Sequence, residues 1–257
     1  MNRIKEAIKE RGYALGAATL TTNPDLIEVM GKAGLDFIWV DLQHSGCSPY
    51  DSNTIINLLR AAELNNCTLL VRLPHLEFSM IGKVLDCGVK ALLIPEVKDQ
   101  RDIDLLIKAG RFNVGEYDGF RSSGTCRASE WLSSTYEQLV KANEDIMLGV
   151  MLENKEILDS LGSSVHLKGI DFAFFGPSDL SLSLNLKLDR THPIILEYRK
   201  KMLDYCKSLG VYPGIGIYDI EAAKKAIKEG FKLITIASDL QLIFREIKSR
   251  VEALRKI

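Results

Sequence analysis

Short apolar runs alternate with amphipathic segments along most of this chain. A continuous apolar run fits a strand buried on both faces, whereas apolar residues three or four positions apart fit a helix with one buried side. Strands are therefore predicted at residues 13–19, 37–40, 68–72, 91–94, 147–152, 171–175, 213–217 and 233–237. Eight strands that alternate with helices indicate a parallel α/β protein.

The helices between these strands are placed by capping residues and apolar spacing. Asn23 and Pro24 are typical of a helix start, and Gly34 is typical of a helix end. Further helices are predicted at residues 3–10, from Ser48 and Pro49 onward, at 80–87, 99–109, 129–142, 193–209, 219–230 and 239–257, with a short one that ends at Leu161. Residues 110–128 and the segment after Asp179 are predicted as loops, and a loop as long as the first is usually functional or mobile.

A weak internal repeat sharpens the fold prediction. Gly34, Gly88, Gly169 and Gly230 each precede an apolar residue, an Asp or Lys, and then a strand. Glycine tolerates the positive φ that a turn from helix to strand requires. The four copies fall on the second, fourth, sixth and eighth strands, and alternate strands share layers in a (β/α)8 barrel. We predict one TIM-barrel domain over residues 1–257, with an N-terminal helix. An open doubly wound sheet is the alternative, although no G-x-G-x-x-G follows the first strand.

The charge balance disfavours several classes of partner. Lys and Arg number 33 and Asp and Glu 34, for a net charge of -1, and no basic block is present. Neither nucleic acid nor an acidic membrane surface is therefore an expected partner. No segment has the roughly 20 apolar residues needed to span a bilayer, and the N-terminal residues do not resemble a signal peptide. The five dispersed cysteines fit reduced thiols, so a cytoplasmic protein is expected.

Charged side chains stand where the predicted strands end. Asp41 and His44 follow the second strand, Arg72 ends the third, Glu153 follows the fifth, and Asp179 comes shortly after the sixth. The carboxyl ends of the strands carry the active site in enzymes with a TIM barrel. We expect these five side chains to converge.

The five side chains could together bind a metal ion, stabilise an anion and transfer a proton. Glu153 and Asp179 offer oxygen ligands for a hard divalent cation such as Mg²⁺ or Mn²⁺. Arg72 offers a planar fork for a carboxylate or enolate oxygen. His44, oriented by Asp41, is suited to carry a proton near neutral pH. No lysine ends a strand, so a Schiff-base mechanism lacks its nucleophile.

Each of these residues also has a purely structural interpretation. Glu153 and Asp179 would suit the first turn of a helix, where a carboxylate is favoured by the helix dipole. Asp41 would cap the next segment, His44 would be a surface loop residue, and Arg72 would form a surface ion pair. The functional interpretation depends on the five side chains lying together.

Several short motifs occur in an order and spacing that resembles a known family. They are Asp41-Leu42-Gln43-His44, Val71-Arg72-Leu73-Pro74, Leu92-Leu93-Ile94-Pro95, Gly119-Phe120-Arg121, Leu152-Glu153 and Phe175-Gly176-Pro177-Ser178-Asp179-Leu180-Ser181. Over nearly the whole chain they resemble the HpcH/HpaI family of metal-dependent 2-oxo-acid aldolases, which is related to the citrate lyase β-subunit. The resemblance implies reversible cleavage of a 4-hydroxy-2-oxo acid into pyruvate, or a related 2-oxo acid, and an aldehyde.

The resemblance also implies how the substrate is held. Glu153 and Asp179 would bind the metal, and backbone N–H groups near Gly176 and Ser178 would help to bind pyruvate. Arg72 would stabilise the enolate oxygen.

For the proton transfer, the resemblance implies that His44, paired with Asp41, moves the proton of the 4-hydroxyl group. It further implies a homo-oligomer, a trimer or hexamer, in which the last helix packs on a neighbouring barrel. Leu240, Phe244, Ile247, Val251 and Leu254 form an apolar seam on that helix. The seam would serve such packing or would cover the helix's own barrel.

Two departures from the family pattern concern the substrate pocket. Gln43 stands where the family usually has Glu, and Met151 stands where many members have Gln two residues before the metal-binding Glu. Two alternatives to an aldolase therefore stay open. One is a lyase of the citrate lyase type that acts on a CoA thioester, and the other is a non-catalytic barrel that binds an oxo acid.

Overall fold

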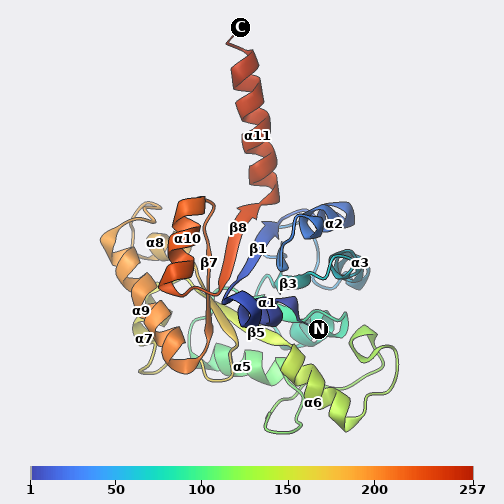
Figure 1. Cartoon of the computed structure of the whole chain (residues 1–257). Helices are drawn as coiled ribbons and strands as arrows, with labels where there is room; N and C mark the ends of the chain where they lie inside the picture. Colours follow the sequence, from blue (N-terminus) through green and yellow to red (C-terminus); the bar gives the residue numbers. More distant parts are fainter. Residues whose placement is uncertain (1, 257) are drawn as a thin grey trace.

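Eight parallel strands close into a barrel in the order of the sequence, in a computed structural model that describes residues 2–256 (Figure 1). The strands are β1 (Ala14–Thr19), β2 (Phe37–Asp41), β3 (Thr68–Arg72), β4 (Ala91–Ile94), β5 (Met147–Leu152), β6 (Phe172–Phe175), β7 (Tyr212–Gly216) and β8 (Leu233–Ser238). The predicted TIM barrel is confirmed, and each strand lies within about two residues of its predicted range.

Helices connect and surround the strands (Figure 1). They are α1 (Arg3–Arg11), α2 (Pro24–Lys32), α3 (Ser52–Glu63), α4 (Phe78–Asp86), α5 (Gln100–Gly110), the short 3₁₀ helix η1 (Arg127–Ser129), α6 (Tyr136–Asp145), α7 (Lys155–Ser160), α8 (Pro177–Ser183), α9 (Pro193–Leu209), α10 (Ile220–Glu229) and α11 (Asp239–Leu254). Residues 111–126 contain neither helix nor strand, as predicted.

Three predictions of local structure were wrong, two of them because a helix cap was overlooked. The helix expected from Ser48 begins at Ser52, where the side chain of Asp51 accepts the N–H of Thr54 at 3.2 Å. The helix expected from residue 129 begins after Thr135, which forms a capping box with Gln138. The segment after Asp179, predicted as a loop, begins inside helix α8, so Asp179 lies in the first turn of a helix, as its structural interpretation required.

The repeated glycines adopt the backbone conformation that the sequence predicts. Gly34, Gly88, Gly169 and Gly230 have φ values of +92°, +97°, +88° and +110°. These are left-handed conformations that favour glycine. The repeat therefore marks the turns that lead into the even-numbered strands.

Inside the barrel, three glycines of odd-numbered strands face phenylalanine rings of even-numbered strands. Phe37, Phe172 and Phe174 point inward from the even strands β2 and β6 and are fully buried. A Cβ added at Gly16, Gly149 or Gly214, on the odd strands, would lie 2.3, 2.2 or 2.7 Å from one of these rings. The bare backbone of the odd strands thus makes room for the rings, as expected when alternate strands fill alternate layers.

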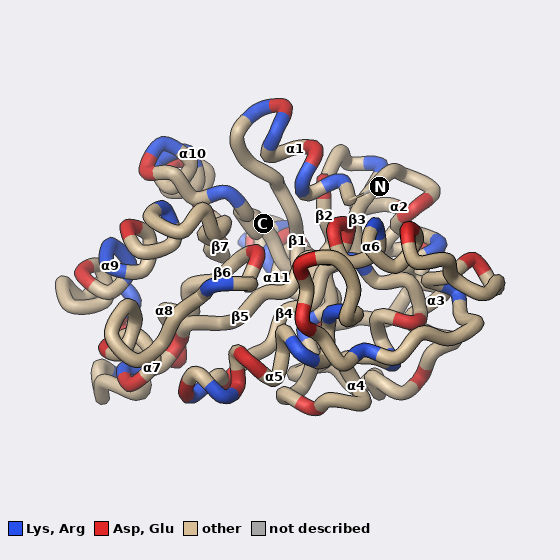
Figure 2. Tube along the Cα trace, turned by 90° about the horizontal axis from the view of Figure 1, so that it is seen from below, with Lys and Arg blue, Asp and Glu red and all other residues tan. Residues whose placement is uncertain are grey.

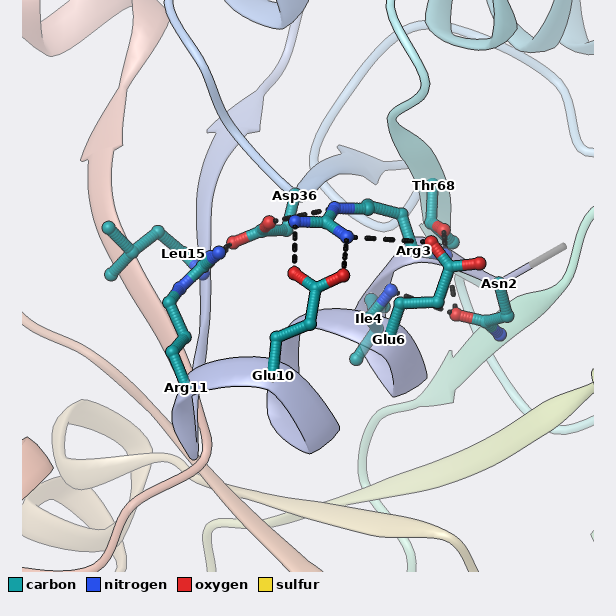
Figure 3. A network of polar contacts seen from close by, with 9 residues as sticks. All are labelled: Asn2, Arg3, Ile4, Glu6, Glu10, Arg11, Leu15, Asp36 and Thr68. Carbon is teal, nitrogen blue, oxygen red and sulfur yellow. Dashed lines mark hydrogen bonds and ion pairs between the residues drawn. The ribbon is translucent and has the colours of Figure 1, made fainter.

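Helix α1 lies at the amino-terminal end of the barrel, and its buried Ile4 joins the interior cluster. Asp36, at the start of β2, pairs with Arg3 at 3.3 Å and with Arg11, and it accepts the N–H of Leu15 at 2.8 Å (Figure 3). Arg3 also forms a two-point contact with Glu10 at 2.9 Å. These charges attach α1 to the strand starts and have a structural role.

Helix α11 stands away from the rest of the molecule, beyond the carboxyl end of β8 (Figure 1). Its apolar seam is therefore uncovered: Phe244 is 64% and Ile247 is 57% exposed. The alternative in which the seam covers its own barrel is wrong.

On the surface of the barrel, acidic and basic residues are interspersed along α9 and α10 (Figure 2). Within residues 2–256, no helix combines the length and apolar character required to cross a membrane.

Candidate active site

Asp41 and Arg72 form a buried ion pair with two contacts at the carboxyl end of the barrel. They are direct partners in the register of β2 and β3. Nε and Nη2 of Arg72 donate to the two carboxylate oxygens of Asp41 at 3.0 and 2.5 Å. The guanidinium also lies over the ring of Trp39, 5.1 Å from its centroid. Arg72 is thereby fixed, and its Nη1 group, which makes no hydrogen bond within residues 2–256, remains for a ligand.

Glu153 follows β5 and is only 5% exposed. Its Oε1 accepts the backbone N–H of Glu96 at 2.8 Å, and no Lys or Arg of residues 2–256 forms an ion pair with it. Burial raises the pKa of Glu153 above its ordinary value. The charge of Asp179 adds to this rise, and the Glu96 N–H and the Arg72 guanidinium oppose it. This carboxylate is therefore held in an environment that disfavours its negative charge.

Asp179 lies in the first turn of α8, close enough to Glu153 to influence its pKa. Its side chain is exposed and makes no hydrogen bond or ion pair within residues 2–256. Gly176, directly before α8, passes close to Glu153, because a Cβ at that position would lie 2.5 Å from Cβ and 2.9 Å from Oε2 of Glu153. Only a glycine lets the backbone pass so close to this carboxylate.

The predicted pairing of His44 with Asp41 takes a different form in the structure. The contact is made by the backbone N–H of His44, which donates to Oδ1 of Asp41 at 3.3 Å, beside the N–H of Gln43 at 2.9 Å. The imidazole is exposed and has no hydrogen-bond partner in the described part of the chain. Asp41 therefore orients the loop that carries His44, and its side-chain partner is Arg72.

The expected donors near Gly176 also need a correction. The N–H of Gly176 is already bonded to the carbonyl oxygen of Leu152 at 3.1 Å. The N–H of Ser178 belongs to the first turn of α8, where backbone donors have no partner within the helix. Of the two positions, Ser178 is the one with a free donor, whereas Gly176 acts through its small size.

Sequence reasoning placed Glu96 at the end of the fourth strand but gave it no role, and it did not consider Trp39. Glu96 binds Glu153 through its backbone and accepts a hydrogen bond from Nε2 of Gln43 at 2.9 Å. Its position directly after Pro95, where β4 ends, was the available signal. Trp39 lies beneath Arg72 and packs edge-on against Phe174 with centroids 5.0 Å apart. Two-residue alternation with Asp41 was enough to place it inside the barrel.

The charged residues at the barrel mouth offer two protein ligands for a cation. Among residues 2–256, no three His, Cys, Asp or Glu side chains are grouped to hold a metal ion by themselves.

A cavity of about 670 Å³ lies away from the barrel mouth, against α4, α6 and the loop that contains Arg121. Arg121 pairs there with Asp86 at 2.9 Å. None of the candidate residues lines that cavity, so this loop arginine is not part of the set at the barrel mouth.

Comparison with known proteins points to a family over most of the chain. Residues 19–245 match the family model of HpcH/HpaI aldolase/citrate lyase. The chain is 26% identical over 251 residues to a 5-keto-4-deoxy-D-glucarate aldolase of Escherichia coli (strain K12), which covers 97% of this chain and 95% of that protein. It is 26% identical over 259 residues to a hydroxypyruvate/pyruvate aldolase of Paraburkholderia phytofirmans, with 99% and 98% covered.

A solved structure supports the same relationship. The crystal structure of an HpcH/HpaI aldolase/citrate lyase family protein from Burkholderia cenocepacia superposes with a TM-score of 0.88 at 26% identity. The match covers 99% of this chain and 100% of that one. Sequence and fold therefore agree along the full length of the barrel.

Proposed function

Because this chain belongs to the HpcH/HpaI aldolase/citrate lyase family, we propose that it is a divalent-metal-dependent aldolase. The proposed reaction is the reversible cleavage of a 4-hydroxy-2-oxo acid into pyruvate, or a related 2-oxo acid, and an aldehyde. The observation that carries this proposal is the pair Glu153 and Asp179, which form no ion pair within residues 2–256 and of which Glu153 lies close to the fixed guanidinium of Arg72. Relatives named as 2-oxo-acid aldolases support the same class of reaction.

The donor set fits a hard divalent cation. A buried carboxylate is costly unless a positive charge compensates it, and Glu153 has only a backbone N–H. Glu153 and Asp179 would hold Mg²⁺ or Mn²⁺ through oxygen, with further positions left for water and the 2-oxo acid. When bound, such a cation acts as a Lewis acid that polarises a carbonyl group. The N–H of Ser178 would donate to the carboxylate of the 2-oxo acid.

Arg72 and His44 would carry out the charge and proton movements. Cleavage breaks the bond between C3 and C4 of the substrate. The proton of the 4-hydroxyl group passes to the imidazole of His44 while that oxygen becomes the aldehyde carbonyl. The electrons of the broken bond move toward the keto group, and Nη1 of Arg72 donates a hydrogen bond to the oxygen that gains negative charge. The imidazolium of His44 would then return this proton, directly or through a water molecule, so that C3 is protonated, pyruvate forms and the imidazole is restored.

We also propose that α11 joins two copies of the chain. Its exposed seam includes Phe244 and Ile247, and a monomer rarely leaves so many large apolar side chains on one projecting helix. Packing of α11 on the barrel of a neighbouring copy would cover the seam. A trimer or hexamer is the expected assembly, and light scattering after size-exclusion chromatography measures it.

The function is tested by pyruvate release from a panel of 4-hydroxy-2-oxo acids. Release is expected with Mg²⁺ or Mn²⁺ and should stop when EDTA is added. If no member of the panel yields pyruvate in a metal-dependent way and pyruvate itself does not bind, the aldolase proposal fails. CoA release from a 3-hydroxy thioester, tested in parallel, would instead favour a lyase of the citrate lyase type.

A further inference from the structure

Glu96 has an unusual place at the barrel mouth. It follows Pro95 directly after β4, and its φ of +55° lies in the left-handed region that residues with a side chain rarely adopt. Such conformations persist where the surrounding structure enforces them, often at functional sites. In Glu96 this backbone conformation accompanies two contacts that reach different parts of the candidate active site.

Those contacts connect the loop after β2 with the end of β5. The backbone N–H of Glu96 donates to Oε1 of Glu153 at 2.8 Å. The side chain of Glu96 accepts from Nε2 of Gln43 at 2.9 Å, and the N–H of Gln43 in turn donates to Asp41 at 2.9 Å. Glu96 is exposed, and no Lys or Arg of residues 2–256 pairs with it. It therefore presents an uncompensated negative charge at the mouth.

The position of His44 indicates which half of the substrate would lie near the negative charge of Glu96. If His44 takes the proton of the 4-hydroxyl group, as the proposed function requires, the aldehyde half lies on the β2 side of the mouth. Gln43 is the chain neighbour of His44, and Glu96 is hydrogen-bonded to Gln43. The aldehyde half would therefore lie beside the Glu96 carboxylate.

Arg72 is occupied by its pairing with Asp41, and two further arginines lie toward β7. Arg190 and Arg245 are close enough to Tyr218, which follows β7, to influence its pKa. In the closed order of strands, β7 is three strands from β4. On the β2 side, the hydrogen bond from Gln43 therefore places the carboxylate of Glu96, which has no ion-pair partner within residues 2–256, next to the expected aldehyde half.

We propose that Glu96 determines which aldehyde the enzyme accepts. Its carboxylate repels an aldehyde that carries its own carboxylate and accepts hydrogen bonds from the hydroxyl groups of a neutral hydroxyaldehyde. The substrate class is then a 4-hydroxy-2-oxo acid whose only carboxylate is that of the 2-oxo acid half. This inference rests on the proposed aldolase function and adds the identity of the second product class to it.

The test compares the aldol addition of pyruvate to neutral and anionic aldehydes. Glycolaldehyde and glyceraldehyde represent the neutral class, and glyoxylate and succinic semialdehyde represent the anionic class. The wild-type protein should give a higher kcat/KM for the neutral class. Glu96→Gln removes the charge but can keep the hydrogen bond from Gln43, and it should lower the neutral-to-anionic ratio about fivefold, the effect of one unit charge a few ångströms away in water. Glu96→Lys should lower it further.

Glu116→Gln is the matched control. Glu116 is an exposed acid in the loop 111–126, so this substitution removes one negative charge outside the segment that follows β4. Pyruvate binding gives a readout independent of the aldehyde. The chain has two tryptophans, so Trp131→Phe leaves Trp39, beneath Arg72, as the only indole reporter. In that background, Glu96→Gln should leave the pyruvate affinity in the presence of Mg²⁺ unchanged.

The outcomes separate the two proposals. If aldehydes react but the wild type does not favour the neutral class, or if Glu96→Gln leaves the ratio unchanged, the inference about Glu96 is overturned and the aldolase function stands. If no aldehyde reacts and pyruvate does not change the emission of Trp39, the aldolase proposal fails, and the inference about Glu96 fails with it.

Discussion

Asp41 and Arg72 face each other at the ends of two neighbouring strands, and the guanidinium uses Nε and Nη2 for this one carboxylate. Such a two-point contact fixes the plane of the guanidinium as well as its position. The group that remains free, Nη1, therefore has a defined direction. Asp41 therefore holds Arg72 in place, whereas the sequence predicted that Asp41 would orient the His44 side chain.

The first prediction concerns Arg72→Lys. A lysine keeps a positive charge but cannot contact both oxygens of Asp41 while also donating to a substrate oxygen. We expect kcat to fall by roughly a hundredfold or more, the typical loss when one donor to a developing oxyanion is removed. Steady-state kinetics measure this effect, and thermal unfolding checks that the fold is kept. A variant with nearly full kcat would contradict the role of Arg72.

The second prediction concerns Glu153 and pH. Because its folded pKa is raised above the ordinary 4.5, the folded state of the metal-free protein binds this proton more tightly than the unfolded state does. Its contribution therefore makes stability fall as pH rises from about 4.5 through the raised value. Glu153→Gln should lack this part of the pH dependence. Denaturant unfolding of both proteins across that pH range, without metal, measures the difference.

The same carboxylate predicts a loss of metal affinity in acid. Protons compete with the cation for Glu153, so Mn²⁺ affinity should decrease as pH falls through the raised pKa. Isothermal titration calorimetry follows this trend, and Glu153→Gln should abolish binding. Binding of Mn²⁺ with full affinity by Glu153→Gln would show that the metal site lies elsewhere.

The third prediction separates proton transfer from metal binding. His44→Ala should retain Mn²⁺ affinity and lose cleavage by about 10²- to 10⁴-fold, the usual contribution of a positioned acid or base. His166→Ala is the control, since His166 is also exposed but lies before β6, at the opposite end of the strands. A His44→Ala variant with the wild-type rate would require another proton acceptor.

The fourth prediction concerns the close approach of Gly176 to Glu153. Gly176→Ala places a Cβ 2.5 Å from Cβ of Glu153, so the carboxylate must move and Mn²⁺ affinity should fall at least tenfold, about 1.4 kcal/mol. Gly82→Ala, in α4, meets nothing within 4 Å and should keep the affinity and slightly increase stability. Equal metal affinity in the two variants would contradict the close approach at Gly176.

The fifth prediction concerns α11. Phe244→Asp combined with Ile247→Asp places charges on the exposed seam and should convert an oligomer into smaller species. Ser249→Asp adds charge to the same helix at a polar position and should leave the assembly intact. Sedimentation velocity distinguishes the two results. A wild-type protein that sediments as a monomer at micromolar concentration would refute the interface.

The barrel could be predicted from the sequence because its signals are local. Gly34, Gly88, Gly169 and Gly230 report a turn that each residue forms with its own neighbours. The run from Phe37 to Val40 is apolar on both sides because both sides are buried. Such features need no information about distant residues.

The sequence predicted which charged residues end the strands, but it did not predict their contacts. Strand ends placed Asp41, Arg72 and Glu153 together correctly, since parallel strands in a barrel share one carboxyl end. Which partner each side chain takes depends on register and rotamer, so the pairing of Asp41 with Arg72 and the backbone contact from Glu96 could not be predicted. The direction of α11 could not be predicted either, because its apolar seam would fit its own barrel or that of another copy.

The barrel interior and the barrel mouth differ in how readily they tolerate substitution. Gly16, Gly149 and Gly214 cannot gain a side chain unless a facing phenylalanine is lost at the same time, so change there requires two coordinated mutations. At the mouth, Gln43 and Glu96 make a single side-chain contact, and either can change alone. Under the proposed function, substitutions at the mouth would change the accepted aldehyde one residue at a time while the barrel beneath stays constant.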